Sequence, residues 1–537
     1  MKINLLDTDS IMKVRFLFLA AAMLSVVSVA AQETYEDAKI ATEDLNGTAR
    51  YVGMGGALDA LGADISTIGT NPAGIGLFRH SKMDISAGMV SQSDAADYPH
   101  GDATNASFDQ VGFVWSTRSN ESSFLNFAFN YHKSRNFNLI LSADDALSHK
   151  TAEGATVGAS QNKLTWMKDY NGLLFRDSDP DGKPDYGSAY YSCNQLDDLY
   201  SRNLLFNNDY EVSFLDAQSY DFDRAHTGYI GEYDFNVSGN INDRVYLGMT
   251  LGLHDVHYKH ISDYTELMVP NRDNINTLNV YDERKITGVG VDAKFGVIFR
   301  PVEYQPLLLG ASISTPTYYS LTSRNYTELS DSYNTAYNTS SYDYQIYTPW
   351  KFGLSMGYTV GNFLALGASY EFADFGHINS RIEYDGFDAY DPYDDSVADS
   401  DMNQHTKQTL KGVSTLKLGV EVKPVPELAL RAGYNYVSSM YEKDGFKDGT
   451  LQSPGVYYAS TTDFTNWQST NRLTLGIGYR VGKVNLDAAY QYSASKGDFY
   501  PFMSYEDNDY YDYDNKADAV EVNNKRHQLL FTVGYTF

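Results

Sequence analysis

The last ten residues of the chain, QLLFTVGYTF (residues 528–537), alternate between bulky apolar side chains and small or polar ones. Successive side chains of a β-strand point to opposite faces, so this segment has one apolar face and one small or polar face. The apolar face holds Leu529, Phe531, Val533, Tyr535 and Phe537. Such a strand separates two unlike media.

The same alternation recurs upstream, for example in residues 289–297, 350–358 and 472–479. The face made of small residues also carries charges, namely Asp292, Lys294, Lys351, Lys417, Arg431 and Asp487. A polar inner face behind a bulky outer face is typical of a transmembrane β-barrel with a wet lumen. A soluble β-sandwich also alternates and is the competing interpretation.

The spacing of these segments predicts fourteen antiparallel strands, near 81–92, 107–118, 122–136, 229–240, 244–261, 284–300, 306–320, 343–359, 362–383, 409–423, 427–441, 471–481, 484–496 and 525–537. The connections alternate between short turns and long loops, the longest being 137–228. We expect the turns in the periplasm and the loops outside the cell. Lipid offers no partner to a free strand edge, so the sheet must close into an all-β ring, here predicted over residues 81–537.

The N-terminus carries an export signal. Met12-Lys13-Val14-Arg15 is basic, residues 16–31 are apolar, and Val29-Ala30-Ala31 offers a signal-peptidase site. We predict that residues 1–31 are a cleaved signal peptide, with Met12 the true start. With the barrel pattern, this predicts a Gram-negative outer-membrane protein.

Composition narrows the function. The formal net charge is −28, which disfavours nucleic acid as a partner. Cys193 is the only cysteine, so no internal disulfide framework can form. Aromatic residues reach 14%, as in proteins that meet a membrane interface. The acidic clusters at 391–401 and 506–514 fall in predicted loops, where they indicate a solvated surface or a site for divalent ions that bridge lipopolysaccharide.

Residues 32–80, between the cleavage site and the first strand, do not alternate and are rich in glycine. A barrel of this circumference would be open to water unless something fills it. We predict that this segment is a compact plug, or hatch, inside the lumen.

The hatch contains an ordered set of motifs directly before the first strand: Met54-Gly55-Gly56-Ala57, Asp64-x-Ser66-Thr67 and Asn71-Pro72-Ala73-Gly74. This succession resembles the FadL-type transporters of long-chain fatty acids and aromatic hydrocarbons. The resemblance implies a fourteen-stranded barrel with an N-terminal hatch, and passive uptake of hydrophobic small molecules. It also implies capture among the outer loops, a rearrangement of the hatch, and release through a gap in the wall. Asn71, Pro72, Ala73 and Gly74 are the predicted gating residues.

A second candidate site lies in the longest loop. Asp177, Asp179, Asp181 and Asp185 offer oxygens at alternate positions around Gly182, as in a calcium loop. Position twelve is Ser188, where an EF-hand has Glu. We predict either a calcium ion that orders the loop, the one cofactor expected, or a solvated acidic turn.

Two further sequence patterns, a series of histidines and a nucleophile-like motif, do not predict a metal site or a catalytic site. His254, His257 and His260 are spaced for a helix, but on a strand His257 opposes the other two, which disfavours a metal or haem site and favours polar residues at the outer rim. The nucleophile-like pattern of residues 353–357 lies inside a strand rather than at a strand-to-helix turn. We therefore expect no enzyme.

The sequence thus predicts an outer-membrane transporter of hydrophobic small molecules such as long-chain fatty acids. The alternative is a surface receptor for haemin or another ligand, or an adhesin. The expected partners are the apolar ligand, lipopolysaccharide and outer-membrane lipid, and the barrel-assembly machinery, for which Phe537 resembles the C-terminal recognition signal.

Overall fold

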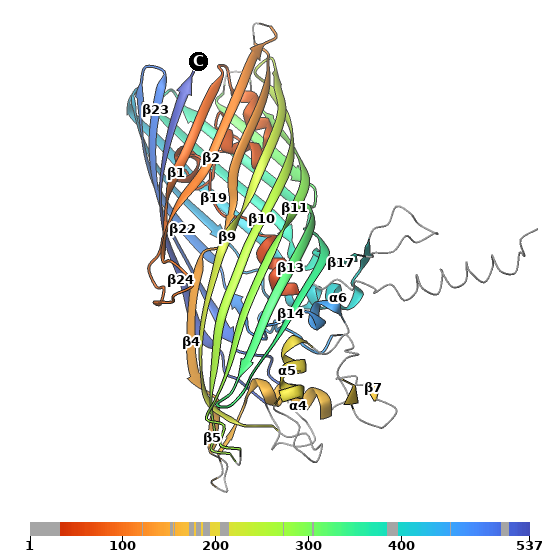
Figure 1. The fold of residues 1–537 in the computed structure, drawn as a ribbon. Helices are drawn as coiled ribbons and strands as arrows, with labels where there is room; N and C mark the ends of the chain where they lie inside the picture. The colour runs from red at the N-terminus through yellow and green to blue at the C-terminus, as the bar shows by residue number, and fades with distance from the viewer. Residues whose placement is uncertain are drawn as a thin grey trace, which may run out of the picture.

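The computed structural model describes residues 33–120, 122–150, 154, 156–170, 177–178, 184–185, 194–203, 214–271, 273–302, 305–383, 396–451, 453–505 and 515–537. The predicted signal peptide therefore lies outside the described residues. The strands form a tall tilted barrel, and the short helices of the N-terminal segment lie within it (Figure 1).

The wall is a closed ring of fourteen antiparallel strands, as the sequence predicted. In order around the ring it comprises β1 (Lys82–Gln92), β2 (Thr104–Arg118), β3 (Phe124–Asn136) continued by β4 (Leu139–Ala146), β9 (Ala217–Ile241), β10 (Val245–Met268), β11 (Thr277–Phe299), β12 (Leu307–Ser314) continued by β13 (Tyr318–Ser330), β14 (Thr335–Tyr347) continued by β15 (Lys351–Val360), β16 (Leu364–Asp374) continued by β17 (Asn379–Glu383), β19 (Gly412–Val425), β20 (Leu428–Val437), β21 (Phe464–Trp467) continued by β22 (Thr470–Val481), β23 (Val484–Tyr500) and β24 (Val520–Thr536). The ring closes where β1 pairs with β24, from Lys82 opposite Thr536 to Gln92 opposite Arg526.

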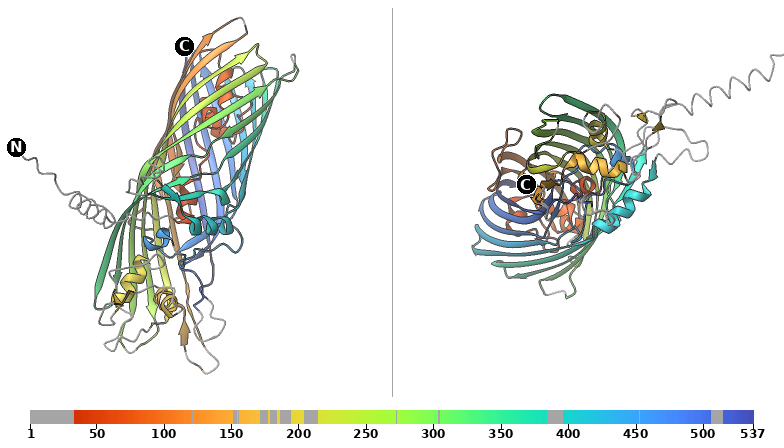
Figure 2. Two further views of the ribbon diagram at one scale, coloured as in Figure 1. Left: turned by 90° about the vertical axis from the view of Figure 1, so that its right-hand side faces the viewer. Right: turned by 90° about the horizontal axis from the view of Figure 1, so that it is seen from below.

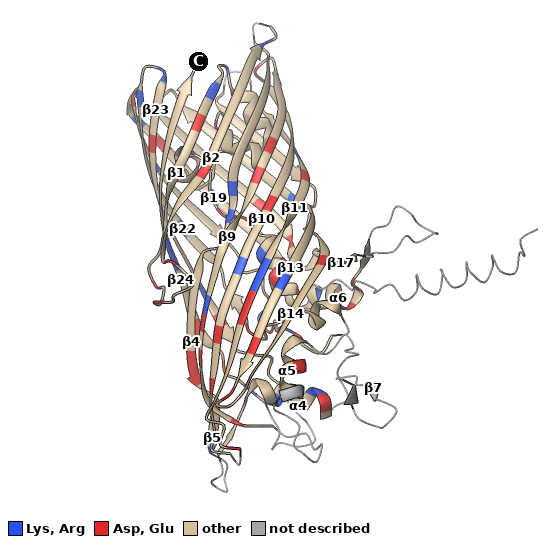
Figure 3. Cartoon of the chain, in the orientation of Figure 1, with Lys and Arg blue, Asp and Glu red and all other residues tan. Residues whose placement is uncertain are grey.

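The two faces of the wall differ as the alternation requires. Leu475 and Phe531 are 60% and 54% exposed, whereas their neighbours Thr474 and Thr532 are 2% and 3% exposed. The bulky side chains thus point away from the lumen instead of meeting in a shared core, which excludes the β-sandwich. Charged positions interrupt uncharged stretches along β9, β10 and β11 (Figure 3). Of the charged residues assigned to the inner face, four are buried in the lumen: Asp292, Lys294, Lys417 and Arg431.

The short turns have the backbone that tight hairpins need. Asn242 and Asp243, between β9 and β10, both have positive φ, at 53° and 52°. This pair of left-handed residues matches the twist of antiparallel strands. Gly361 and Gly482 supply the positive φ in the turns after β15 and β22.

The loop boundaries are the part of the prediction that is wrong. The predicted loop 137–228 contains β4, and β9 begins at Ala217, with Leu139 paired to His226. The predicted loop 321–342 contains most of the β13–β14 hairpin. The buried face of β13 carries the polar side chains Ser323, Asn325 and Thr327, so the apolar alternation that marks a strand is lost while the ladder continues.

A hydrophobic core of buried side chains lies among the outer loops and the ends of the strands beside them. It joins Leu164, Leu199 and Phe222 to Phe499 and Phe502. The elements at this end are β5 (Ser148–Lys150), β6 (Thr156–Gly158), α4 (Gln161–Tyr170), β7 (Asp177–Ser178), β8 (Pro184–Asp185), α5 (Gln195–Asn203), η3 (Phe375–His377), β18 (Ser396–Ala398), α6 (Ser400–Thr409) and α7 (Pro454–Tyr457).

None of the helices in the described part of the chain is long and apolar enough to cross a membrane.

Candidate functional site

The hatch, residues 33–80, lies within the ring of strands when the barrel is viewed along its axis (Figure 2). It contains α2 (Thr34–Ile40), α3 (Ala49–Gly53), η1 (Ile65–Gly69) and η2 (Pro72–Leu77). Each of the last three begins at a side-chain cap: Thr48, Asp64 and Asn71 accept hydrogen bonds from the backbone N–H groups of their own first turns. Two of the three sequence motifs, those beginning at Asp64 and Asn71, are therefore helix starts of the hatch, and Met54-Gly55-Gly56-Ala57 follows the end of α3.

Asn71 and Pro72 pack against the inner face of β10 and β11. Asn71 is 1% exposed, and its side-chain oxygen accepts from the N–H of Ala73 at 3.2 Å. The wall opposite has glycines at Gly248 and Gly296, where a Cβ would collide with the Pro72 backbone and the Asn71 side chain. The structure thus brings the predicted gating residues Asn71 to Gly74 together in a glycine-lined seat on the wall.

A second close approach holds the other glycine motif. Gly55 has φ +63°, and a Cβ there would lie 2.9 Å from the carbonyl oxygen of Leu418 and from the N–H nitrogen of Tyr434. Only glycine fits a left-handed position this close to another backbone. The hatch is therefore seated against β19 and β20 as well as β10 and β11.

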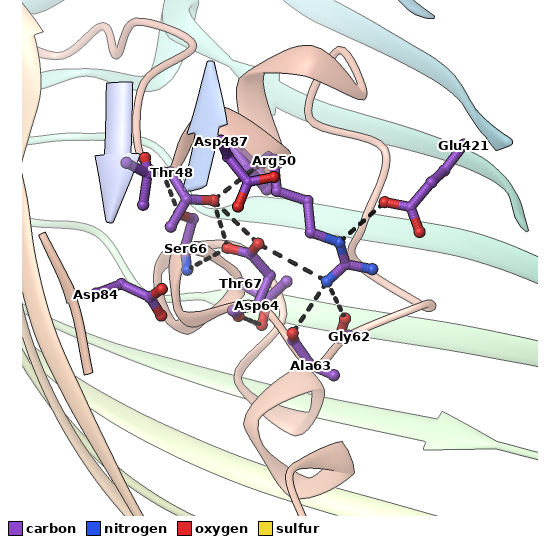
Figure 4. A network of polar contacts seen from close by, with 12 residues as sticks. Thr48, Arg50, Gly62, Ala63, Asp64, Ser66, Thr67, Asp84, Glu421 and Asp487 are labelled. Atoms are coloured by element: carbon purple, nitrogen blue, oxygen red, sulfur yellow. Dashed lines mark hydrogen bonds and ion pairs between the residues drawn. The ribbon is translucent and has the colours of Figure 1, made fainter. Parts of the chain in front are cut away.

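Asp64 is the centre of a polar network inside the hatch (Figure 4). The Thr48 hydroxyl lies 2.8 and 3.0 Å from its two carboxylate oxygens, and the N–H of Ser66 donates to it at 3.1 Å. Its backbone carbonyl accepts from the hydroxyl of Thr67 at 2.8 Å. The Asp64-x-Ser66-Thr67 motif thus ties the start of α3 to the start of η1.

Arg50 links this network to the wall (Figure 4). Its guanidinium donates to the carbonyl of Ala63 at 3.0 Å and to Glu421 of β19 at 3.4 Å. Glu421 also accepts from Arg431 of β20 at 2.6 Å. This part of the hatch is therefore held to the barrel by charge as well as by packing.

A cavity of about 280 Å³ opens between the hatch and the wall. Hatch residues 39, 41–46, 51, 66, 69 and 70 line one side. The wall supplies an apolar part, namely Phe137, Phe375, Val413, Val437, Met440, Tyr441 and Trp467, and a mainly basic part, namely Arg135, Lys351, Lys417, Arg472 and Arg526 with the acidic Glu232 and Glu371. Its volume is near the lower end of small-molecule pockets, about 300 Å³. The lining suits a solute with an apolar body and an acidic group.

A smaller cavity, about 30 Å³, lies among the outer loops above α2. Leu164, Met402, Val456 and Met503 give it apolar walls, and Tyr35 of α2 forms part of its lining. The N-terminal helix of the hatch therefore separates this outer cavity from the larger one in the lumen.

Beside the larger cavity, β2 and β3 part. Their ladder ends at Gln110 opposite His132, and residues 104–108 of β2 pair only with β1 among the described strands. The register of β3 on β9 shifts between Lys133 and Arg135, which turns β3 away. We call residues 104–109 with residues 133–136 the β2–β3 parting.

Two hatch residues occupy this parting. The backbone N–H of Asp44 donates to the carbonyl of Ser134 at 2.8 Å, and its carboxylate accepts from the N–H of Asn136 at 2.9 Å. Asn46 bridges the two strands, because its amide donates to Asp109 and to the carbonyl of Lys133, both at 3.0 Å. The hatch thus completes the hydrogen bonding that the wall lacks here.

Three arginines from β3, β22 and β24 surround the Asp44 carboxylate. Arg135 lies 3.0 Å from it, and Arg472 and Arg526 each lie 4.0 Å from it. Burial alone would raise the pKa of Asp44, but the three guanidinium groups outweigh it and hold that pKa below its usual value. The contact is therefore charged at neutral pH.

Sequence reasoning missed Asp44, Asn46 and the parting. The available signal was the tract Lys133-Ser134-Arg135-Asn136, which breaks the alternation inside a predicted strand. Strands lose alternation where they leave the sheet or gain a bulge. No spacing within the hatch marks Asp44 itself.

The structure also places the other candidate residues from the sequence. His254 and His260 face the lumen and are buried, and His257 is exposed on the other face, as predicted. They do not lie at the outer rim as expected, because β10 runs on to Met268. Residues 353–357 lie within β15. In the calcium loop, Asp179 and Asp181 lie outside the described residues, and only the backbone pairing of Asp177 with Asp185 is described.

The chain is similar to solved structures of a FadL homologue and of toluene transporters. A Pseudomonas aeruginosa FadL homologue is 12% identical, over 92% of this chain and 99% of that one, with a TM-score of 0.48. The toluene transporter TodX of Pseudomonas putida is 11% identical over the same shares, with a TM-score of 0.47, and TbuX of Ralstonia pickettii is 10% identical, with a TM-score of 0.46. No protein-family model and no curated protein matches the chain.

Proposed function

We propose that this chain is an outer-membrane channel for the passive uptake of hydrophobic small molecules, gated by its hatch. The observation that carries this proposal is the β2–β3 parting, where Asp44 and Asn46 of the hatch stand between a lumen cavity and the outside of the barrel. A hatch that moved only at these residues would open a sideways path without opening a water-filled pore.

The proposed path begins in the apolar cavity among the outer loops. Displacement of α2 would admit the solute to the larger cavity, where the apolar wall holds its body. From there the β2–β3 parting leads outward. Phe108 lies in the parting, is 49% exposed on the outer face and stacks on Tyr131 with ring centroids 6.0 Å apart. The exit therefore meets the apolar belt of the barrel.

No energy source is needed for this transfer. A hydrophobic solute is repelled by the polar lipopolysaccharide layer and gains free energy when it reaches hydrocarbon. The protein has only to provide a route past the polar layer. Such a route is a transport function, and we propose no catalytic one.

We further propose long-chain fatty acids over monoaromatic hydrocarbons as the solutes. Arg135, Arg472 and Arg526 of the basic part surround the Asp44 carboxylate, and a solute carboxylate would take its place when Asp44 moves away. Toluene has no group that would use them.

The two ends of the hatch would then have different roles. Asn71 to Gly74 sit in the glycine-lined seat on β10 and β11 and would anchor the hatch. Residues 42–46 contact the wall mainly through polar groups, and we propose that they move. On this proposal the predicted gating residues Asn71 to Gly74 do not move themselves; the moving gate is the segment 42–46.

Uptake by whole cells tests the proposal. A host strain without its own transporter of hydrophobic compounds would express the full chain and receive labelled oleate, labelled toluene or a labelled disaccharide. We expect oleate uptake to rise well above that of the empty strain, with no change for the disaccharide. Uptake of neither hydrophobic probe would contradict the proposal, and toluene uptake alone would contradict the preference for fatty acids. A surface receptor or adhesin would change none of the three.

Three partner assignments also remain proposals. We propose calcium in the 177–185 loop, lipopolysaccharide and membrane lipid around the barrel, and recognition of Phe537 by the barrel-assembly machinery. The N–H of Phe537 donates to the carbonyl of Ser81 at 3.0 Å, which keeps the last residue in the wall. Calcium-dependent protection of the loop from protease would support the first, and deletion of Phe537 should lower the amount of assembled barrel.

A further inference from the structure

Six ionisable side chains converge inside the barrel, on four adjacent strands. They are His132 of β3, Glu232 and Asp234 of β9, His254 of β10, and Asp292 and Lys294 of β11. All except His132 are at most 6% exposed. Gly252 on β10 leaves the space that they fill, because a Cβ there would collide with Asp292.

The charges of this cluster do not balance. Lys294 contacts all three carboxylates, pairing with Glu232 and lying 3.3 Å from Asp234 and 3.5 Å from Asp292. One ammonium among three buried carboxylates leaves two negative charges. The nearest further pair, Glu43 with Lys351, is neutral as a whole. Buried charge must be compensated, so the cluster needs two protons, one on each imidazole, or one divalent cation.

His254 distinguishes these two solutions. Its Nδ1 lies 3.4 Å from the hydroxyl of Tyr319, which leaves Nε2 facing a carboxylate oxygen of Asp292 at 3.2 Å without forming a hydrogen bond. The other oxygen of Asp292 is buried and also has no hydrogen bond. A protonated Nε2 would donate to the facing oxygen of Asp292, and the absence of that hydrogen bond instead suits two ligands placed beside one cation.

The donor atoms have the separation that a metal ion requires. Donors about 2.0–2.1 Å from a tetrahedral ion lie roughly 3.3 Å from one another. Nε2 of His254 lies 3.2 Å from a carboxylate oxygen of Asp292. One donor atom from each of these three residues lies within 4.8 Å of the others.

We propose that Glu232, His254 and Asp292 bind one divalent first-row transition-metal ion such as Zn²⁺. An imidazole with two carboxylates suits this class better than Ca²⁺ or Mg²⁺, which prefer oxygen alone. Tyr319 and Thr317 would orient the ligands from behind, since the Thr317 hydroxyl donates to Asp292 at 3.3 Å. The ion would join β9, β10 and β11 beside hatch residues Gly69 and Thr70, which line the adjoining small cavity with Asp292.

In this arrangement Lys294 competes with the metal, because its ammonium occupies the same set of carboxylates. The proposal therefore makes an unusual demand. Removal of a lysine from the cluster should strengthen metal binding, whereas removal of a ligand should weaken it.

The experiment is a Zn²⁺ titration of the full-length protein in detergent, stripped with a chelator and followed by calorimetry and elemental analysis. We expect one Zn²⁺ per chain in the wild type, at least tenfold weaker binding in His254→Gln and Asp292→Asn, and tighter binding in Lys294→Met. His257→Gln is the matched control, because this histidine lies on the same strand and is exposed on the outer face. Its binding should equal that of the wild type.

Absence of saturable binding in the wild type would overturn the proposal, as would equal weakening in His254→Gln and His257→Gln. Heat-modifiable migration on gels shows whether each variant is folded. If the ligand variants do not fold, the visible absorption spectrum of the wild type loaded with Co²⁺ tests the proposed site. A visible ligand-field spectrum of mixed nitrogen and oxygen ligation supports the site, and a spectrum of aqueous Co²⁺ contradicts it.

Discussion

The backbone N–H of Asp44 in the hatch donates to the carbonyl of Ser134 in the wall at 2.8 Å, at the point where β3 turns away from β2. The hydrogen bond replaces one that a continuous ladder would supply. Because the replacement comes from the plug rather than from a neighbouring strand, the wall is complete only while the hatch is in place.

Substitution Asp44→Ala should loosen this contact. Asp44 and Arg135 are partly exposed, so loss of this charged hydrogen bond costs about 2 kcal/mol, and it leaves three arginines without their carboxylate. That energy corresponds to roughly a thirtyfold larger open population. Amide hydrogen exchange of residues 42–46 in the folded barrel should show faster rates than in the wild type. Asp94→Ala, at an exposed loop carboxylate, is the control and should not change them.

Substitution Gly296→Leu should unseat the other end of the hatch. Even a Cβ at this position would collide with the side chain of Asn71, and the wall strand cannot give way without breaking its ladder. We expect protease to cut residues 60–75 in folded barrels of this variant and not in the wild type. In Gly69→Ala the nearest atom would be 3.6 Å from the new Cβ, in the side chain of His132, so this hatch variant should stay resistant. Resistance of both would show that Asn71 is not an anchor.

The outer end of the hatch should respond to acid through His405 of α6. Nδ1 of His405 lies 2.9 Å from the hydroxyl of Thr34, and Nε2 donates to the carbonyl of Phe446 at 2.8 Å. Burial lowers the pKa of His405 and outweighs the opposing effect of this carbonyl. The folded state therefore prefers the neutral ring.

Because the unfolded chain takes up a proton near pH 6.5, the contact between α2 and α6 loses stability as the pH falls through that value. Hydrogen exchange of residues 400–409, corrected for its intrinsic pH dependence, should be faster at pH 5 than at pH 7.5. His405→Gln should abolish the difference. An equal difference in that variant would assign the effect to another group.

A lysine in place of Leu475, which is 60% exposed on the outer face, should destabilise the barrel in lipid by roughly 2–4 kcal/mol if the position lies near the bilayer midplane. Reversible unfolding from lipid vesicles by guanidinium measures this difference. Leu475→Ala separates loss of apolar area from the cost of charge. A cost for lysine no greater than for alanine would mean that this face does not meet lipid.

The strands of the barrel were predictable because two unlike media force alternation on every strand that separates them. Leu529 to Tyr535 in β24 and Phe352 to Tyr358 in β15 show this directly. The outer ends of the strands were not predictable, because strands such as β13 there bury polar side chains, among them Ser323 and Asn325, on the face that would otherwise be apolar. The alternation of apolar residues therefore locates the apolar belt of the barrel and does not locate the ends of its strands.

The candidate site was predictable only where its residues are neighbours in sequence. The caps at Asp64 and Asn71 are local and were visible as motifs. The contact of Asp44 with Ser134 joins residues that no periodicity relates. The cluster at His254 likewise draws its carboxylates from β9 and β11. The spacing of the histidines along β10, which disfavoured a metal site, therefore could not reveal this cluster.

A reversible disulfide across the β2–β3 parting tests the central claim most directly. The variant Asn46→Cys with Asp109→Cys, in a background with Cys193→Ser, replaces a 3.0 Å hydrogen bond between hatch and wall with a covalent link. A link between Ser91 and Thr104, whose hydroxyl oxygens lie 2.8 Å apart in the β1–β2 ladder, is the matched control. We predict that oxidation stops oleate uptake in the first variant, that reduction restores it, and that the control transports equally in both states. Unchanged uptake through the locked hatch would contradict the account.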